Sequence, residues 1–390
     1  MPPVTNADPA APLHGITVID AGLLVQGPQA AAMLQLLGAD VIKVELPNIG
    51  DHARWLPVAA DDMRAPFFLS CNRGKRSITA DLRTPAGREV FLKLVERADI
   101  VITNFKPGTM ESWRLGYDDV AAVNPAIVYA TGSAFGSRGP DAVREGADLS
   151  AQAAGGLIAD IGVDGGDPSP VPATICDHMA SQNIVSGVLA ALLARARTGR
   201  GQHVEVSLLG SQLWAQAPEY TYTLLTGNDP GRANQGHPMI PGMYGIFPTS
   251  DGWIALVGLI GAARASFLTL IDREDLTMET DRTIMFDAIN AAMRTRPTAD
   301  WCAALREREI RHAPVRDRAA VVADPQVLAN DYVVTPGGGA PIVGSPIRMS
   351  SAPMRIEIDA PTLGQHTDEI LGELGYSADD IAALRAAAAV

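Results

Sequence analysis

Short apolar runs alternate with longer segments of helical periodicity through the first third of the chain. The runs are rich in valine and isoleucine, as buried strands are, and the segments between them carry helix-start signals such as Pro28 and the pair Thr84-Pro85. We expect strands at 16–20, 40–45, 77–82, 99–104 and 127–131, and helices at 28–37 and 84–98. Strands that alternate with helices of this length favour an α/β fold with a parallel sheet and helices on both faces. Ligands of such sheets bind beyond the carboxyl ends of the strands.

The pattern changes after Ser207, where the alternation of strands and helices fades. Residues 244–256 predict two strands joined by a Ser-Asp-Gly turn, and the chain is helical from Arg282 onward. Beyond Gln365 we expect two short helices, the second beginning at a Ser377 cap. The middle of the chain therefore has a different architecture from its beginning.

Composition and charge narrow the class of protein. Of the 390 residues 47% are hydrophobic and 19% are charged, and no apolar run of the ~20 residues that a membrane span needs is expected. The net charge of −13 argues against nucleic-acid binding. The three cysteines lack metal-ligand spacing and favour a reducing compartment, and the Pro- and Ala-rich start does not have the order of a secretory signal. These features predict a cytoplasmic protein that binds no membrane, nucleic acid or metal.

One carboxylate stands out because it precedes a long run of small residues with helical character. Asp177 lies near the start of the segment 174–194. A helix N-terminus offers unpaired N–H donors and a partial positive charge, which favour the ionised carboxylate and hence a nucleophile. The alternative is that Asp177 only caps the helix. Sequence chemistry by itself leaves both roles open.

Basic residues collect at predicted strand ends and in the loops after them, although the protein is acidic overall. The loop 21–27 after the first strand lacks the G-x-G-x-x-G spacing that places a pyrophosphate on a helix N-terminus, which disfavours a nicotinamide cofactor. Several cations that follow sheet elements suit a polyphosphate ligand instead. They are Lys43, Arg73, Lys75, Arg76, Lys106 and Arg114.

Six ordered motifs carry a resemblance to a known family. From about His14 to its C-terminus the chain resembles the family III CoA-transferases, which include formyl-CoA and carnitine CoA-transferases and the α-methylacyl-CoA racemases. The many motifs, in the same order, make a chance match improbable. They are Gly-Ala-Asp-Val-Ile-Lys-Val-Glu at 38–45, Asn-Arg-Gly-Lys-Arg-Ser at 72–77, Asn-Phe-Lys-Pro-Gly at 104–108, Gln-Ala-Ala-Gly-Gly at 152–156, Thr-Gly-Arg-Gly-Gln-His-Val-Glu-Val-Ser at 198–207 and Leu-Gly-Gln-His-Thr-Asp-Glu-Ile-Leu at 363–371.

The resemblance implies an architecture that periodicity cannot supply. A Rossmann-like large domain with a parallel sheet is built from both chain ends, and a smaller α+β domain comes from the later middle. Two ring-shaped subunits interlock as a homodimer. On this basis we expect a flexible tail at 1–13, a CoA-binding large domain at 14–210, a linker at 211–225, a small domain at 226–330 and a return to the large domain at 331–390.

The resemblance also implies an activity. In the transferases of this family an aspartate ahead of the small-residue helix is the covalent nucleophile, and Asp177 matches that position. We therefore expect a CoA-transferase that moves CoA from an acyl-CoA to a carboxylic acid through a mixed anhydride and an aspartyl-CoA thioester. CoA is then a substrate, and no tightly bound cofactor is expected.

Two alternatives compete with transfer. The racemase branch pairs the matching aspartate with a histidine in an upstream Gly-His-Asp segment, and Ala147 stands at the histidine position here. Alanine cannot transfer a proton, so a two-base racemase would need a substitute base. The third hypothesis is a CoA-binding protein that has kept the fold without turnover.

The same resemblance assigns residues to the two parts of the site. Val25 stands where formyl-CoA transferases carry glutamine, which disfavours formate or oxalate. The apolar character of Leu23, Leu24, Val25 and the region 239–243 favours a larger or less polar acyl group. The residues expected to bind CoA are Val44, Leu46, Lys75, Arg76, Asn104, Phe105 and Arg114, with Arg114 and Lys75 or Arg76 at phosphates. The residues expected to line the substrate pocket are Val25, Gln26, Ala147, Gly155 and Gly156.

Overall fold

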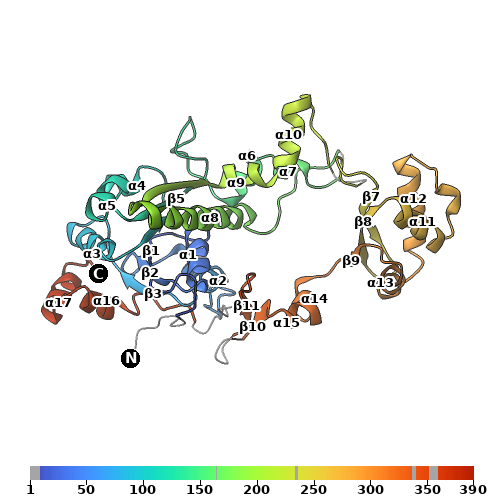
Figure 1. Cartoon of the computed structure of the whole chain (residues 1–390). Helices are drawn as coiled ribbons and strands as arrows, with labels where there is room; N and C mark the ends of the chain where they lie inside the picture. The colour runs from blue at the N-terminus through green and yellow to red at the C-terminus, as the bar shows by residue number, and fades with distance from the viewer. Residues whose placement is uncertain (1–8, 164, 233–235, 336–339, 351–358) are drawn as a thin grey trace. The chain divides into compact units, whose positions relative to one another are not determined.

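The chain divides into two compact units, and the first of them contains both chain ends. The computed structural model describes residues 9–163, 165–232, 236–335, 340–350 and 359–390 (Figure 1). The first unit comprises Met1–Gly155, Val171–Ala215 and Pro325–Val390, and the second comprises Gly156–Pro170 and Gln216–Asp324.

A six-stranded sheet forms the centre of the first unit, and every neighbouring pair of its strands is parallel. The strand order is β3-β2-β1-β4-β5-β6, which is the order of a Rossmann fold. The predicted parallel sheet is therefore confirmed. Its strands are β1 (Thr17–Asp20), β2 (Asp40–Glu45), β3 (Arg76–Thr79), β4 (Ile100–Thr103), β5 (Val128–Ser133) and β6 (Gln202–Ser207).

Helices cover both faces of this sheet, because alternate residues of each strand point to opposite sides. Val18 of β1 packs in the cluster beneath α1 and α8, whereas its neighbour Ile19 packs beneath α3, α5 and α16. Helix α3 begins as its sequence predicts, with Thr84 Oγ1 accepting the Gly87 N–H at 3.0 Å. The helices and short strands of this unit are α1 (Gln26–Leu36), η1 (His52–Trp55), α2 (Pro66–Asn72), α3 (Pro85–Val95), α4 (Thr109–Ser112), α5 (Tyr117–Val123), α6 (Asp148–Ala154), α8 (Ile175–Thr198), α9 (Leu208–Ala215), α15 (Pro325–Ala329), β10 (Val333–Val334), β11 (Ile342–Val343), α16 (Thr367–Glu373) and α17 (Ala378–Ala386).

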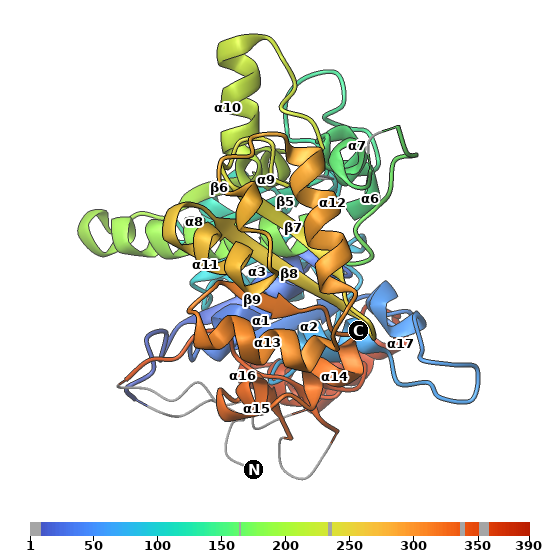
Figure 2. The same ribbon diagram turned by 90° about the vertical axis from the view of Figure 1, so that its right-hand side faces the viewer.

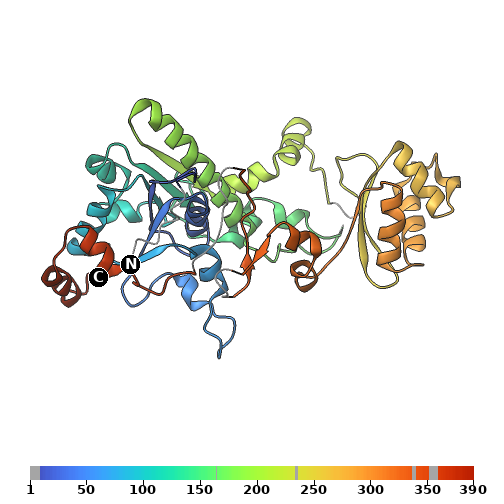
Figure 3. The same cartoon turned by 60° about the horizontal axis from the view of Figure 1, so that its bottom comes forward.

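The C-terminal segment closes the β3 edge of the sheet. Ser77 of β3 donates its N–H to His366 Nδ1 at 3.0 Å, and its carbonyl accepts the His366 N–H at 2.9 Å. Thr367 Oγ1 accepts the N–H of Thr79 at 3.2 Å. Figure 3 shows the red helices α16 and α17 beside the cyan helices that follow β3, with which they share a core. An edge strand that would otherwise expose its backbone is thus covered.

The second unit is built on a three-stranded antiparallel sheet with the order β7-β8-β9. Helices α11, α12 and α13 lie over one face of it (Figure 2), and their apolar side chains form a separate core around Phe247, Phe267 and Trp301. The two strands expected within 244–256 are β7 and β8. The elements of this unit are α7 (Leu157–Asp160), α10 (Ala217–Thr226), β7 (Met243–Pro248), β8 (Trp253–Leu259), α11 (Gly261–Leu270), η2 (Glu274–Leu276), α12 (Arg282–Met293), α13 (Thr298–Glu307), β9 (His312–Pro314) and α14 (Arg318–Val322).

Four of the expected boundaries differ from the structure, and one of them is the end of the small domain, which lies at Asp324 and not at residue 330. Residues 156–170 belong to the second unit, because the Arg232 guanidinium donates to the carbonyls of Ala159 and Gly166 at 2.7 and 2.9 Å. The expected linker 211–225 is instead helical and divided between the units, in α9 and α10. Residues 1–8 of the expected tail lie outside the described residues, but Leu13 is buried and donates its N–H to the Leu37 carbonyl at 2.9 Å.

Helix α8 bears on the expectation that no apolar run is long enough to cross a membrane. By length and composition it could, since its most apolar 18-residue window has a mean hydropathy of 1.2. Core helices of soluble proteins pass the same test, and one face of α8 packs against α1, β5 and β6.

Candidate functional site

The loop after β1 is fixed at the point where the strand order reverses. Strands β1 and β4 are neighbours there, and ligands of doubly wound sheets bind outside the carboxyl ends of such strands. The side chain of Asn104, just after β4, accepts the Leu23 N–H at 2.7 Å and donates to the Leu23 carbonyl at 2.9 Å. Asp51 Oδ1 accepts the N–H of Leu24 at 2.9 Å. Asn104 therefore holds the loop, which carries Val25 and Gln26 at its end.

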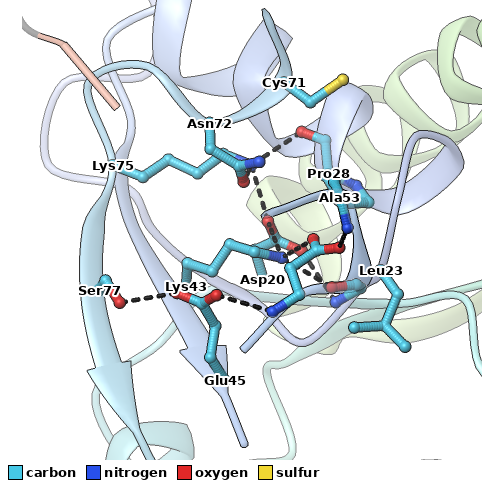
Figure 4. A network of polar contacts seen from close by, with 12 residues as sticks. Asp20, Leu23, Pro28, Lys43, Glu45, Ala53, Cys71, Asn72, Lys75 and Ser77 are labelled. Atoms are coloured by element: carbon cyan, nitrogen blue, oxygen red, sulfur yellow. Dashed lines mark hydrogen bonds and ion pairs between the residues drawn. The ribbon is translucent and has the colours of Figure 1, made fainter. Parts of the chain in front are cut away.

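A buried network of charges supports the loop from below (Figure 4). Lys43 Nζ donates to the Gly22 carbonyl at 2.7 Å and lies 2.9 Å from Asp51 Oδ2. Lys75 Nζ donates to Asp20 Oδ2 at 2.7 Å, and also to the Pro28 carbonyl and Asn72 Oδ1 at 2.8 and 2.9 Å. Burial opposes ionisation of Asp20, but the two lysines outweigh it and lower the pKa of this carboxyl. Burial lowers the pKa of Lys75, and the charge of Asp20 opposes that shift. The network is a structural support of the loop.

Two residues expected at CoA phosphates are therefore unavailable for that role. The side chain of Lys75 is fully buried and all three of its N–H donors are used. Arg76 is also buried, with its guanidinium 2.7 Å from Asp40 Oδ2 and 2.9 Å from Glu373 Oε1. Burial opposes the charge on Arg76, yet these carboxylates raise its pKa. The expectation that Lys75 or Arg76 contacts a phosphate is wrong, because each is committed to carboxylates of the fold.

A largely apolar pocket of about 210 Å³ opens beside the loop, at the ends of β1, β2 and β4. Phe105 and Trp113 form one wall, with ring centroids 5.2 Å apart in an edge-to-face arrangement. Arg114, the next residue, is exposed and lies in a left-handed conformation with φ +56°. Its guanidinium has no ion pair among the described residues. The residues of this pocket are Ala21, Leu23, Val44, Glu45, Leu46, Ile49, Gly50, His52, Ala80, Asp81, Leu82, Arg83, Phe105 and Trp113. Val44, Leu46 and Phe105 thus meet in one pocket.

A second pocket, of about 310 Å³, lies at the ends of β4, β5 and β6. Its floor includes His203, whose Nε2 lies 2.9 Å from Thr131 Oγ1 and whose ring stacks on Tyr117. Lys106 and Arg138 bring positive charge to it. Arg138 is exposed and has no ion pair in the described part of the chain, and sequence reasoning missed it. Its position in the loop after β5 was the available signal.

Asp177 is the third residue of α8 and does not cap the helix. The cap comes from another element: Asp148 Oδ1, at the start of α6, accepts the N–H groups of Cys176 and Asp177 at 2.7 and 3.2 Å. The carboxylate of Asp177 is half-buried and accepts no hydrogen bond from the residues that the structure describes. Burial first, and then the charge of Asp148, raise the pKa of Asp177 to about 7. The pKa of Asp177 is thus raised, whereas the helix N-terminus was expected to lower it, because burial and the charge of Asp148 oppose ionisation.

The residues that were expected to line the substrate pocket do not all lie at one place in the structure. The Gln26 carbonyl and the Asp177 carbonyl both accept the Ser181 hydroxyl, at 2.7 and 2.8 Å, which ties the end of the β1–α1 loop to the first turns of α8. The backbone of Gln26 therefore lies close to that of Asp177. Ala147 precedes Asp148 and is exposed.

Gly155 and Gly156, which were expected to line the substrate pocket, belong to different units of the chain. The N–H of Gly155 donates to the Ala151 carbonyl at 2.8 Å, and a side chain here would meet Gln212 at 2.5 Å. Close packing of α6 on α9 explains this glycine. Gly156, with φ +76°, belongs to the second unit and lies next to Tyr220.

Comparison with known proteins identifies the class. The chain matches the profile of CoA-transferase family III over residues 13–367, and it belongs to that family. It is 34% identical to the succinate–glutarate CoA-transferase of Agrobacterium fabrum, over 93% of this chain and 96% of the relative. It is also 34% identical to the succinyl-CoA:mesaconate CoA-transferase of Haloarcula hispanica, with the same coverage of both chains. A CAIB/BAIF family protein from Brucella suis has a similar structure, with a TM-score of 0.84, 32% identity and coverage of 93% and 99%. The protein is thus an enzyme of the family III CoA-transferase type.

Proposed function

We propose that this enzyme moves CoA from an acyl-CoA donor to a carboxylic acid acceptor by covalent chemistry on Asp177. The observation that carries the proposal is the half-buried carboxylate of Asp177, which accepts no hydrogen bond from the described part of the chain and lies near the Gln26 end of the loop after β1. A carboxylate that only stabilised the helix would be bonded to first-turn N–H groups, and Asp148 holds those. Asp177 is left free to react.

The proposed reaction begins when the ionised Asp177 attacks the thioester carbonyl carbon. The C–S bond breaks, the CoA thiolate leaves and a mixed anhydride of Asp177 and the acyl group forms. The thiolate then attacks the Asp177 carbonyl carbon, which breaks the anhydride C–O bond, releases the donor acid as a carboxylate and gives an aspartyl-CoA thioester. The acceptor carboxylate repeats these steps in reverse, and the ionised Asp177 is regenerated. Burial of Asp177 supports the route because water would hydrolyse both intermediates.

The apolar pocket suits the adenine end of CoA. Val44, Leu46 and the rings of Phe105 and Trp113 offer apolar and aromatic surface to a flat base. With Lys75 and Arg76 excluded, the exposed guanidinium groups of Arg114 and Arg138 become the leading phosphate ligands.

Racemisation is the second candidate, and Ala147 argues against it. A two-base mechanism needs a second proton-transfer group opposite Asp177. Alanine at the position of the racemase histidine cannot supply one. His178 is exposed and is the next residue along α8, so its side chain points ~100° away from that of Asp177.

Mass spectrometry tests the covalent route. Incubation with succinyl-CoA, the donor suggested by the names of the relatives, is expected to add a CoA-sized mass to the peptide that contains Asp177, and hydroxylamine should remove it. Asp177→Asn serves as the control without an adduct. Deuterium exchange at the substrate α-carbon without an adduct would favour an isomerase. If neither an adduct nor deuterium exchange is detected while CoA still binds, the protein is better described as a CoA-binding protein without turnover.

Thioester exchange between acyl-CoA donors and carboxylic acid acceptors identifies the acids that the enzyme uses. We propose that the enzyme accepts dicarboxylic acids of the kind named for its relatives, with glutarate and mesaconate as the first acceptors for succinyl-CoA. Val25 favours less polar acyl groups, so a panel should add monocarboxylic acyl-CoAs. Chromatography of the thioesters formed identifies the pair with the highest kcat/KM. Turnover confined to formate and oxalate would contradict this assignment.

Replacing Arg114 by alanine is expected to weaken CoA binding roughly tenfold, because a charged hydrogen bond to phosphate is lost, at ~1.4 kcal/mol. Isothermal titration with CoA measures this change. Arg273→Ala is the matched control, since it removes the same charge from an exposed arginine, paired with Asp275 in the second unit. Equal affinities of the two variants would remove Arg114 from the phosphate site.

We also propose that the enzyme is a cytoplasmic homodimer with interlocked subunits, as the resemblance implies. Large apolar side chains that need cover support an oligomer: Leu193 and Trp214 are 65% and 75% exposed in the first unit, and Leu224 is 85% exposed in the second. Light scattering after gel filtration should give twice the chain mass of 41.0 kDa. A monomer at micromolar concentration would contradict the proposal.

A further inference from the structure

Asp148 and Gln152 form a buried clamp at the start of α8. Both residues lie on α6, and Gln152 Nε2 donates to Asp148 Oδ2 at 2.6 Å. The Gln152 carbonyl accepts the Val171 N–H at 3.0 Å, so the amide also holds the segment that leads into α8. The other oxygen of Asp148 binds the N–H groups of Cys176 and Asp177. Every oxygen of the Asp148 carboxylate therefore has a fixed partner.

We propose that Asp148 is a positioning residue, whose carboxylate fixes the first turn of α8 and keeps a second negative charge beside Asp177. This inference rests on the proposed role of Asp177. Asp148 takes up the N–H donors that would otherwise stabilise an ionised carboxylate on this turn. Asp177 is left with its negative charge poorly solvated and opposed by a like charge. Such a carboxylate is a better nucleophile than one bonded to the helix end, because no hydrogen bond must break before it attacks.

Few other groups influence Asp177. Among the described residues packed against the first turns of α8, α6 contributes Asp148, α1 contributes the neutral Gln26, and α9 contributes the neutral Gln212, which contacts Cys176. On α8 itself Cys176 and the exposed His178 are its neighbours. Burial, followed by the charges of Asp148 and Asp177, raises the pKa of the Cys176 thiol to about 12, so this thiol stays neutral. Asp148 is consequently the neighbouring charge whose removal should change the pKa of Asp177.

Asp148→Asn tests the proposal, because the amide oxygen can still accept the first-turn N–H groups while the charge is removed. The pKa of Asp177, about 7 in the native enzyme, should fall by about one unit. The acid limb of kcat/KM then moves to lower pH, and at pH 6 the ratio of kcat/KM to its plateau rises about fivefold. Asp141→Asn is the matched control, since it removes an exposed carboxylate paired with Arg144 in the same loop region. Its profile should coincide with that of the native enzyme.

A direct titration separates this proposal from the proposed function. In protein labelled with ¹³C at aspartate carboxyls, one resonance should titrate near pH 7, disappear in Asp177→Asn and move to lower pH in Asp148→Asn. An unmoved resonance and an unmoved acid limb in Asp148→Asn overturn the role of Asp148, even if the CoA adduct forms. Loss of the adduct with a shifted resonance overturns the nucleophile and leaves the role of Asp148 in place. If Asp148→Asn fails to fold, Asp148→Ser keeps an acceptor oxygen without the charge and gives the same comparison.

Discussion

Asp177→Asn should lower kcat by at least ~10⁴, because no other group takes over when a covalent nucleophile is removed. Affinity for CoA should stay within about tenfold, since the apolar pocket beside Phe105 and the cations near it are untouched. Initial rates of thioester exchange, with CoA binding measured by calorimetry on the same preparation, check both parts. A folded variant with full activity would end the case for Asp177 as the nucleophile.

Stability of the same variant distinguishes lost chemistry from lost structure. Ionising Asp177 is unfavourable in the folded protein, where its pKa is about 7 rather than the ordinary 3.8. Its contribution to stability is therefore fully present below pH 4 and is lost as the pH rises to about 7. Asparagine carries no charge at any pH, so Asp177→Asn should be more stable than the native enzyme above pH 7, by on the order of 2–4 kcal/mol, and similar to it near pH 4. A less stable variant at pH 8 would contradict the pKa argument.

Lys75→Met should destabilise the first unit by about 3–5 kcal/mol, which is the usual effect of removing one partner from a buried ion pair. The variant leaves the carboxylate of Asp20 without its nearest cation, and it also strands Asn72 Oδ1 and the Pro28 carbonyl. Lys43, 3.6 Å from Asp20, offers only partial compensation. Urea unfolding followed by circular dichroism measures the loss.

The control for Lys75→Met is a lysine on the surface. Lys93 is partly exposed, 3.7 Å from Glu89 on the same helix, and lies over the ring of Tyr376. Lys93→Met should change stability by about 1 kcal/mol or less. Comparable losses in the two variants would mean that the buried network of Figure 4 adds no more to the fold than a surface contact.

Local patterns in the sequence were sufficient to predict the strands of the sheet and the starts of several helices. The strand at 40–45 coincides with β2, and the Ser377 cap of α17 accepts the Asp380 N–H at 3.2 Å as expected. These features depend on residues close together in the chain, so composition and spacing encode them. The family motifs pointed to Asp177 as a candidate nucleophile, which periodicity could not do.

Long-range contacts account for what the sequence did not predict. Lys75 was assigned to a CoA phosphate because its partner Asp20 lies 55 residues away, on a strand whose neighbours periodicity does not specify. Asp148 was passed over because it caps a helix that begins 27 residues later. The same reasoning applies to Arg232, which draws 159–166 into the second unit. In each case the sequence shows the charge and hydrogen-bonding groups of the residue, but it does not show which distant residue they contact.

The closure of β3 by His366 and Thr367 has a consequence for how the chain acquires its structure during synthesis. Arg76 and the β3 edge are among the early parts of the sheet to leave the ribosome, yet Glu373 and His366 are nearly 300 residues further along. Until those residues emerge, the edge is an open template and Arg76 lacks two of its carboxylates. The first unit can therefore be completed only after His366 and Glu373 have left the ribosome, and until then the open edge of β3 favours aggregation.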